Sequence, residues 1–285
     1  MKDNFEKFGS KKERKFLPEK LKRVEKVLEE AGAELKKIST LFNQKGFLVD
    51  EECRLDLEKL KKIKGLYAPK VVESDKKRVA TRKKEIEAER ERLLASKNFD
   101  GVFLQKIGEL TEKLKTISFN KFWFKDRFFG LRTSFYDDYF NGIDEIILDP
   151  KTPRVVAAID ITSKKEALRS KIDELRRKTQ NPQSIKLDYG VVAKETKEGL
   201  KITYQPLKEI PLLIFAFEES YEKTLEWWQA IKNEDKKFLD DLLKKEVLLL
   251  KEQCRVCSES LNIPKSLRRE YQALFNFFSK VLEEK

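Results

Sequence analysis

The sequence predicts a mixed α/β domain flanked by long helical segments, and three observations lead to this fold class. Charged residues make up 39% of the 285 positions and hydrophobic residues 40%, with only 10 glycines and 8 prolines, a balance typical of helix-rich proteins. Apolar residues recur at steps of three and four near both ends of the chain. In the centre, short β-branched runs separated by turn residues predict strands.

The N-terminal part, residues 1–118, predicts a basic arm of helical hairpins. The apolar residues of 17–42 have the four-three spacing of a coiled coil, and the following NQKGF stretch should end that helix. Further helices are expected from about Asp50, from Ser74, and over 103–117. Their apolar seams could close within the chain, in a homodimer, or on a helix of a partner.

The next segment, residues 119–140, has ten aromatic residues among its 22 positions. One interpretation is a base-stacking surface for nucleic acid, with interleaved basic side chains as phosphate contacts. These candidate nucleic-acid-binding residues are Lys121, Lys125, Arg127 and Arg132. The other interpretation is a hydrophobic junction between the arm and the following domain, because aromatic side chains dominate core packing.

The α/β domain is expected over residues 119–235, and it begins with an antiparallel hairpin of 142–148 and 154–162 joined by a proline-bearing turn. The remaining elements follow in order along the chain. They are a helix over 163–182, strands over 186–195, 200–207 and 210–219, and a helix over 220–232. Two closing helices, 236–261 and 265–283, form a third segment, 236–285, that should pack on the arm or the core.

The formal net charge is +12, and residues 1–130 hold most of the excess, with 34 Lys and Arg against 23 Asp and Glu. A basic arm attracts polyanions, so nucleic acid is the expected partner, although lysine also simply solvates long helices. The polar N-terminus and the three cysteines predict a cytoplasmic protein. No apolar run approaches the roughly 20 residues of a membrane span, so no membrane contact is expected.

The absence of histidine excludes Ser-His-Asp, Cys-His and histidine-based zinc chemistry. The CRVC stretch at 254–257 is expected to be core cysteine, and no phosphate-binding glycine loop is present. Carboxylate side chains remain as candidates for a catalytic or metal-binding site. Strand alternation can place Asp144 and Asp160 on one side of the hairpin, where a hard cation such as Mg²⁺ or Mn²⁺ would compensate their charge. Alternatively, both lie at strand ends facing water.

An aspartate opening one strand, a turn, and an acidic residue near the end of the next strand, followed by a helix, resemble the PD-(D/E)XK nuclease-like superfamily over residues 130–232. The resemblance implies a restriction-endonuclease-like central sheet and a catalytic site in which Asp144 and Asp160 bind the metal. Asp138, or its neighbour Asp137, would be an additional metal-binding acid. Thr162 stands where the family has its lysine.

Lys164 or Lys165, at the start of the next helix, would substitute for that lysine, and Lys164 is therefore the third candidate catalytic residue. The resemblance implies a magnesium-dependent nuclease that acts on nucleic-acid phosphodiesters. The alternative is a catalytically inactive nuclease fold that serves as a nucleic-acid-binding or protein-interaction scaffold.

Overall fold

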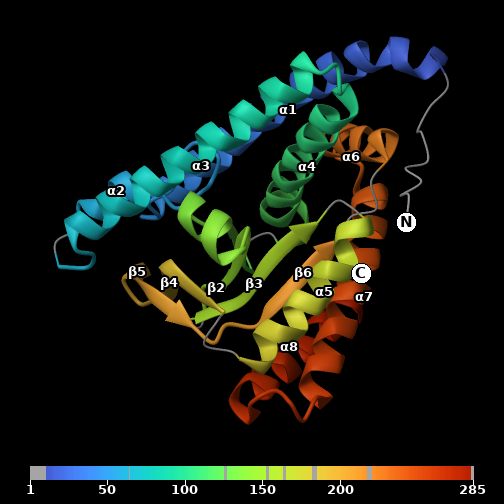
Figure 1. The fold of residues 1–285 in the computed structure, drawn as a ribbon. Coiled ribbons are helices and arrows are strands. Elements are labelled where there is room, and N and C mark those ends of the chain that lie inside the picture. The colour runs from blue at the N-terminus through green and yellow to red at the C-terminus, as the bar shows by residue number, and fades with distance from the viewer. Residues whose placement is uncertain are drawn as a thin grey trace.

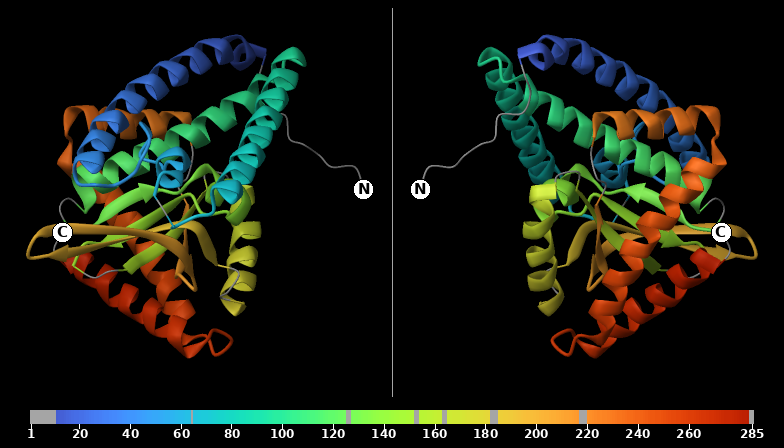
Figure 2. Two further views of the ribbon diagram at one scale, coloured as in Figure 1. Left: turned by 90° about the vertical axis from the view of Figure 1, so that its left-hand side faces the viewer. Right: turned by 90° about the vertical axis from the view of Figure 1, so that its right-hand side faces the viewer.

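The computed structural model describes residues 11–63, 65–124, 127–151, 154–162, 165–181, 185–216 and 220–283. Within these ranges the chain is a mixed helix and strand protein, as the sequence predicted (Figure 1). Helices precede and follow a small central sheet. Figure 2 shows the N-terminal helices largely above this sheet and the last helix below it.

The N-terminal helices are α1 (Lys11–Gln44), α2 (Leu57–Lys61), α3 (Pro69–Ala95) and α4 (Phe99–Ser118). Helix α1 packs along α4 through its apolar seam. The expected helix from Asp50 is only the short α2, because residues 45–56 instead form turns and isolated bridges. Cys53 adopts a positive φ of 61° there, which an α-helix does not allow.

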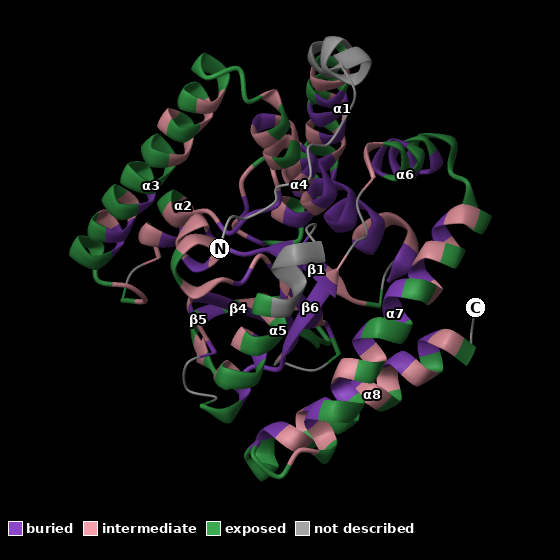
Figure 3. Cartoon of the chain, turned by 45° about the vertical axis from the view of Figure 1, so that its right-hand side comes forward, coloured by how far each residue is buried: buried purple, intermediate pink, exposed green. Residues whose placement is uncertain are grey.

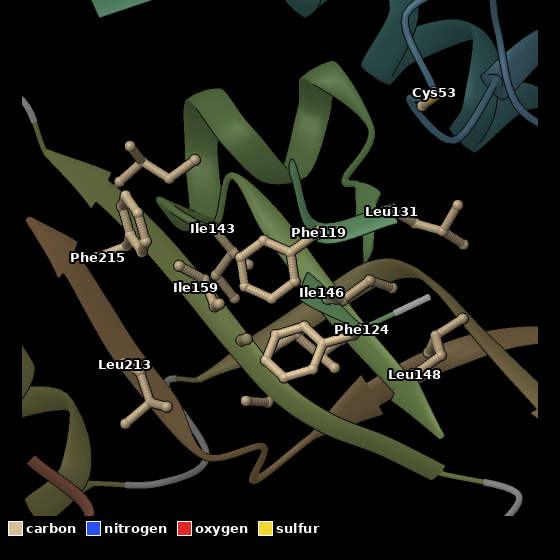
Figure 4. Packing of buried hydrophobic residues seen from close by; sticks show 14 of the residues in the cluster. Cys53, Phe119, Phe124, Leu131, Ile143, Ile146, Leu148, Ile159, Leu213 and Phe215 are labelled. Atoms are coloured by element: carbon tan, nitrogen blue, oxygen red, sulfur yellow. The ribbon is translucent and has the colours of Figure 1, made fainter. Parts of the chain in front are cut away.

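The aromatic segment, residues 119–140, contains three short elements. A short π-helix, η1 (Phe119–Trp123), extends α4, a strand β1 (Phe129–Arg132) follows, and a second short π-helix, η2 (Asp137–Asn141), precedes the hairpin. The strand β1 was not expected. Its neighbouring aromatic rings, among them Phe119 and Phe124, pack on the sheet (Figure 4), which supports the interpretation of this segment as a hydrophobic junction.

The central sheet has the order β1-β2-β3-β6, with β2 (Glu145–Asp149), β3 (Arg154–Thr162) and β6 (Leu212–Ala216). The first three strands are antiparallel neighbours, which confirms the hairpin, and β6 runs parallel to β3. Helix α5 (Lys165–Gln180) follows β3. The strands β4 (Lys186–Thr196) and β5 (Gly199–Lys208) pair with each other in a separate two-stranded sheet.

The C-terminal helices are α6 (Tyr221–Asn233), α7 (Lys236–Glu259) and α8 (Lys265–Glu283). Helices α7 and α8 pack against each other, and α7 also contacts β6. One hydrophobic cluster runs from Val24 in α1 through the sheet to Val281 in α8. The three expected segments therefore share a single core.

Candidate functional site

The hairpin places Asp144 and Asp160 side by side. Glu145 lies opposite Ile159 in the antiparallel register, and the backbone N–H of the preceding Asp144 donates to the Ile159 carbonyl at 2.9 Å. The Asp160 carboxylate is close enough to raise the pKa of Asp144. The backbone N–H of Ile161 donates to Asp144 Oδ2 at 2.6 Å, which fixes the carboxylate against β3.

Asp144 is a carboxylate in a strongly unfavourable electrostatic position. Burial raises its pKa well above the ordinary value, and the nearby carboxylates of Asp138, Glu112 and Asp160 raise it further. Within the described residues, Asp144 makes no ion pair. Burial also raises the pKa of Asp160, against the opposing effect of Lys171. A cation beside Asp144 would relieve this repulsion.

Lys171, on helix α5, is the basic residue that the structure brings to this pair. Its Nζ forms an ion pair with Asp160 Oδ1 and donates to the Ile161 carbonyl at 3.0 Å. Burial lowers the pKa of Lys171, but the carboxylates of Asp160 and Asp144 outweigh this effect, and the net pKa is raised. The side chain is therefore a fixed cation and hydrogen-bond donor at neutral pH.

A second group of carboxylates, Glu112 of α4 and Asp138 of η2, is held by two buried arginines. Arg54 Nη1 lies 2.8 Å from Asp138 Oδ2 and its Nη2 lies 3.4 Å from Glu112 Oε2. Arg132 Nη2 binds Glu112 Oε2 at 2.5 Å, and Arg132 Nη1 lies 3.4 Å from Glu52 Oε2. These pairs join α4, η2, β1 and the 45–56 segment around the acidic centre.

Asp138, the expected additional acid, thus lies close enough to raise the pKa of Asp144, but Arg54 neutralises it. Asp137 is oriented away from the site. Its carboxylate accepts from the Asp188 backbone N–H at 2.7 Å and from the Tyr189 N–H at 3.1 Å, and so joins η2 to β4. Burial raises the pKa of Asp137 to about 6.

The basic residues proposed from the sequence for nucleic-acid binding or catalysis lie in different environments. Lys125 and Lys164 lie outside the described residues, as does the side chain of Lys165. Lys121 Nζ binds Glu34 Oε1 at 2.5 Å, and Arg127 is exposed.

Arg132 differs from its expected role as a nucleic-acid contact. Its side chain is only 3% exposed, and Glu112 and Glu52 occupy its guanidinium. It therefore belongs to the ionic framework of the site.

In the described part of the chain, no three Asp, Glu or Cys side chains converge on a point where they could hold a metal ion. The donor set at the hairpin is two carboxylates, Asp144 and Asp160. Mg²⁺ typically takes only one or two carboxylates and completes its octahedron with water and substrate phosphate oxygens. The cysteines Cys254 and Cys257 are buried in the core, as expected, and the pKa of the Cys257 thiol is raised to about 11 by burial.

Sequence reasoning missed Lys171, Arg54 and Glu112, which come from separate elements. A signal existed for Lys171, because Lys171 and Lys178 are seven residues apart and so share one face of α5. Lys178 Nζ donates to the Asn141 carbonyl at 3.0 Å, so this face is directed toward the site.

Comparison with family models, with curated proteins and with solved structures gave no match to this chain. Among the described residues, no helix has the length and apolar character needed to cross a membrane.

Proposed function

We propose that this protein is a metal-dependent phosphodiesterase of the PD-(D/E)XK nuclease-like class that acts on nucleic acid. The observation that carries the proposal is the grouping of Asp144, Asp160 and Lys171 at the hairpin, where the lysine arrives from the helix that follows the D-x-T strand. The strand, turn, strand and helix order of the resemblance is present. In this proposal Lys171 has the role that the resemblance gave to Lys164 or Lys165.

The residues present suit a hard divalent cation. Asp144 is a buried carboxylate without an ion pair among the described residues, and three other carboxylates raise its pKa. Asp144 and Asp160 would hold Mg²⁺ or Mn²⁺, and the bound ion would supply an activated water and polarise the phosphodiester. No other carboxylate of the centre is equally available, because the arginines occupy Asp138 and Glu112.

Lys171 has a separate role. Two of its three ammonium protons are used by Asp160 and by the Ile161 carbonyl, and the third can donate to a water or a phosphate oxygen. Because its pKa is raised, Lys171 cannot act as a general base. It would instead orient the attacking water and stabilise negative charge that develops on the phosphate.

The test is cleavage of plasmid and of a labelled single-stranded oligonucleotide in Mg²⁺ or Mn²⁺. The wild type should cleave, EDTA should abolish cleavage, and Asp160→Asn should lower the rate by at least about a hundredfold, since it removes a metal ligand. Matched purification of Asp160→Asn excludes a contaminating nuclease, because equal cleavage by both proteins would contradict the proposal.

A second candidate, a catalytically inactive scaffold of the same class, is favoured by one observation. Lys171 already neutralises Asp160, and the arginines neutralise Asp138 and Glu112, so most of the acidic centre is internally paired. In that case the wild type would bind nucleic acid without cleaving it. Any change that Mg²⁺ causes in the melting temperature would then be the same for the wild type and for Asp144→Asn.

A further inference from the structure

Helix α3 carries a concentrated basic segment. Residues 76–84 read KKRVATRKK, six basic residues among nine with no acid, whereas residues 85–95 contain four glutamates. Figure 3 shows α3 largely exposed along its length, and Val79 is the buried position of the 76–84 segment. Five of the six basic residues of this segment are exposed, and the sixth, Lys76, is partly buried and pairs with Glu58 and Glu73.

This basic segment touches the aromatic residues that lead into the acidic site. The Arg78 guanidinium lies 4.3 Å from the ring centroid of Phe140 and 5.1 Å from that of Tyr136, and its Nη1 donates to the Tyr136 hydroxyl at 2.7 Å. Arg78 also lies 3.7 Å from Asp75 Oδ1. Cation–π contacts thus dock α3 on η2.

A second contact links the basic segment to the site itself. Lys83 Nζ lies 3.3 Å from the ring centroid of Phe135, and the Arg54 guanidinium lies 4.4 Å from the centroid of the same ring. Arg54 in turn binds Asp138. The Phe135 ring therefore lies between Lys83 of α3 and Arg54, which belongs to the group of ion pairs near Asp144.

Several exposed side chains of α3 and η2 are available to a ligand; we call this surface, formed by Lys77, Lys83, Lys84 and Phe140, the rim. Within the described residues, Lys77, Lys83 and Lys84 are exposed and make no ion pair, and residue Phe140 is 39% exposed. Exposed cations interleaved with an exposed aromatic ring are the chemistry that binds unpaired nucleotides, because cations follow the phosphates and the ring stacks on a base. A duplex keeps its base faces covered, so an exposed ring gains nothing from it.

We infer that the rim formed by Lys77, Lys83, Lys84 and Phe140 binds single-stranded nucleic acid and leads it to the Asp144–Asp160 site. The inference rests on the proposed function for the direction of the strand, but binding itself needs no catalysis. An acidic protein or an anionic membrane would bind through the lysines alone. Dependence of binding on Phe140 therefore distinguishes nucleic acid from these two ligands.

Binding is measured by fluorescence anisotropy in EDTA with a labelled single-stranded oligonucleotide. The variant Lys77→Gln/Lys83→Gln/Lys84→Gln should weaken binding about tenfold to a hundredfold near 0.1 M salt and reduce the slope of log K against log salt by about 2. The matched control Lys236→Gln/Lys237→Gln/Lys265→Gln changes the same charge at exposed positions of α7 and α8 and should bind like the wild type. Equal losses in both triple variants would overturn the inference.

The aromatic contribution is tested with Phe140→Leu, which keeps an apolar side chain but removes the stacking ring. It should weaken single-strand binding about fivefold to 150-fold, the range for loss of one stacked base, while Phe140→Trp keeps the affinity. Affinity for the duplex of the same sequence should not change. Wild-type affinity of Phe140→Leu, or equal binding of duplex and of vesicles with anionic phospholipid, would overturn the inference.

The two proposals fail separately. Strong binding that depends on the rim, without any cleavage, would remove the proposed function and leave the inference intact. Cleavage at the wild-type rate by both the lysine triple variant and Phe140→Leu would remove the inference and leave the proposed function intact.

Discussion

Lys115 and Glu145 form an ion pair that is completely buried between α4 and β2. Lys115 Nζ lies 2.9 Å from Glu145 Oε2, both side chains have 0% exposure, and the Thr116 hydroxyl donates to the same oxygen at 3.2 Å. Removing one partner leaves an uncompensated buried charge. The pair is therefore costly to break, whatever its net contribution to stability.

We predict that Lys115→Met lowers the free energy of unfolding by roughly 3–5 kcal/mol, because it strands the Glu145 carboxylate. The double variant Lys115→Met/Glu145→Gln should recover part of that loss. Urea denaturation of the wild type and the variants measures both effects. A Lys115→Met protein as stable as the wild type would show that the pair is not buried in this way.

Glu246, on the apolar face of α7, is a buried carboxyl whose two oxygens have no hydrogen-bond partner in the described structure. Burial raises its pKa from the ordinary 4.5 to about 7. The unfolded chain loses this proton near pH 4.5 and the folded protein holds it until about pH 7. The free energy of unfolding therefore falls as pH rises through that window.

Glu246→Gln should remove this dependence. We expect the variant to match the wild type near pH 4 and to be more stable by up to roughly 3 kcal/mol at pH 8, as the pKa shift implies. Denaturation midpoints across this pH range test it, with Glu270→Gln, a carboxyl on α8, as the control. A constant difference between Glu246→Gln and wild type at all pH values would contradict the assignment.

At the scale of elements, the edge strand β6 is covered by side chains of α7 and α8. Gln253 Nε2 donates to the Ile214 carbonyl at 2.7 Å, and its Oε1 accepts from the Ile214 N–H at 2.8 Å. The Tyr271 hydroxyl accepts from the Leu212 N–H and donates to its carbonyl, both at 3.0 Å. Two side chains thus satisfy the backbone groups that an open edge would expose.

Gln253→Leu should accordingly destabilise the protein by about 1–3 kcal/mol, because it leaves buried backbone groups of Ile214 unsatisfied. It should also increase aggregation on mild heating, since an unprotected edge pairs with other chains. Thermal unfolding and light scattering measure the two effects. Gln272→Leu, an exposed position of α8, is the control, and equal behaviour of both variants would contradict this role of Gln253.

Sequence periodicity predicted the elements that have a local apolar pattern and failed where tertiary pairing decides the structure. Helices α1, α4, α7 and α8 have apolar seams that bury one face, and the β2–β3 hairpin has β-branched runs joined by a turn, so local patterns suffice. Cys53 and Leu57 have helical spacing, but within residues 45–56 the bridges of Arg54 to Arg132 and of Val49 to Leu55 override it. Such tertiary pairing leaves no local signal.

At the scale of the whole molecule, only those residues of the candidate site that belong to the β2–β3 hairpin could be predicted from the sequence. The alternation of side chains along strands placed Asp144 and Asp160 on one face, and the register of β2 and β3 agrees with that. Arg54 and Glu112 come from distant parts of the sequence and meet the site only through the packing of α4 and η2. Their roles follow from the assembled fold, which periodicity does not encode.

The proposed mechanism depends most on Lys171 as the lysine of a metal-dependent phosphodiesterase. The most direct measurement is the single-turnover rate of Mg²⁺-dependent cleavage of a labelled single-stranded oligonucleotide by Lys171→Met, with Arg176→Met on the same helix as the matched control. We predict a loss of at least about a hundredfold for Lys171→Met and a wild-type rate for Arg176→Met, because Lys171 binds Asp160 whereas Arg176 is exposed and pairs with Asp173. Wild-type cleavage by Lys171→Met would contradict the account.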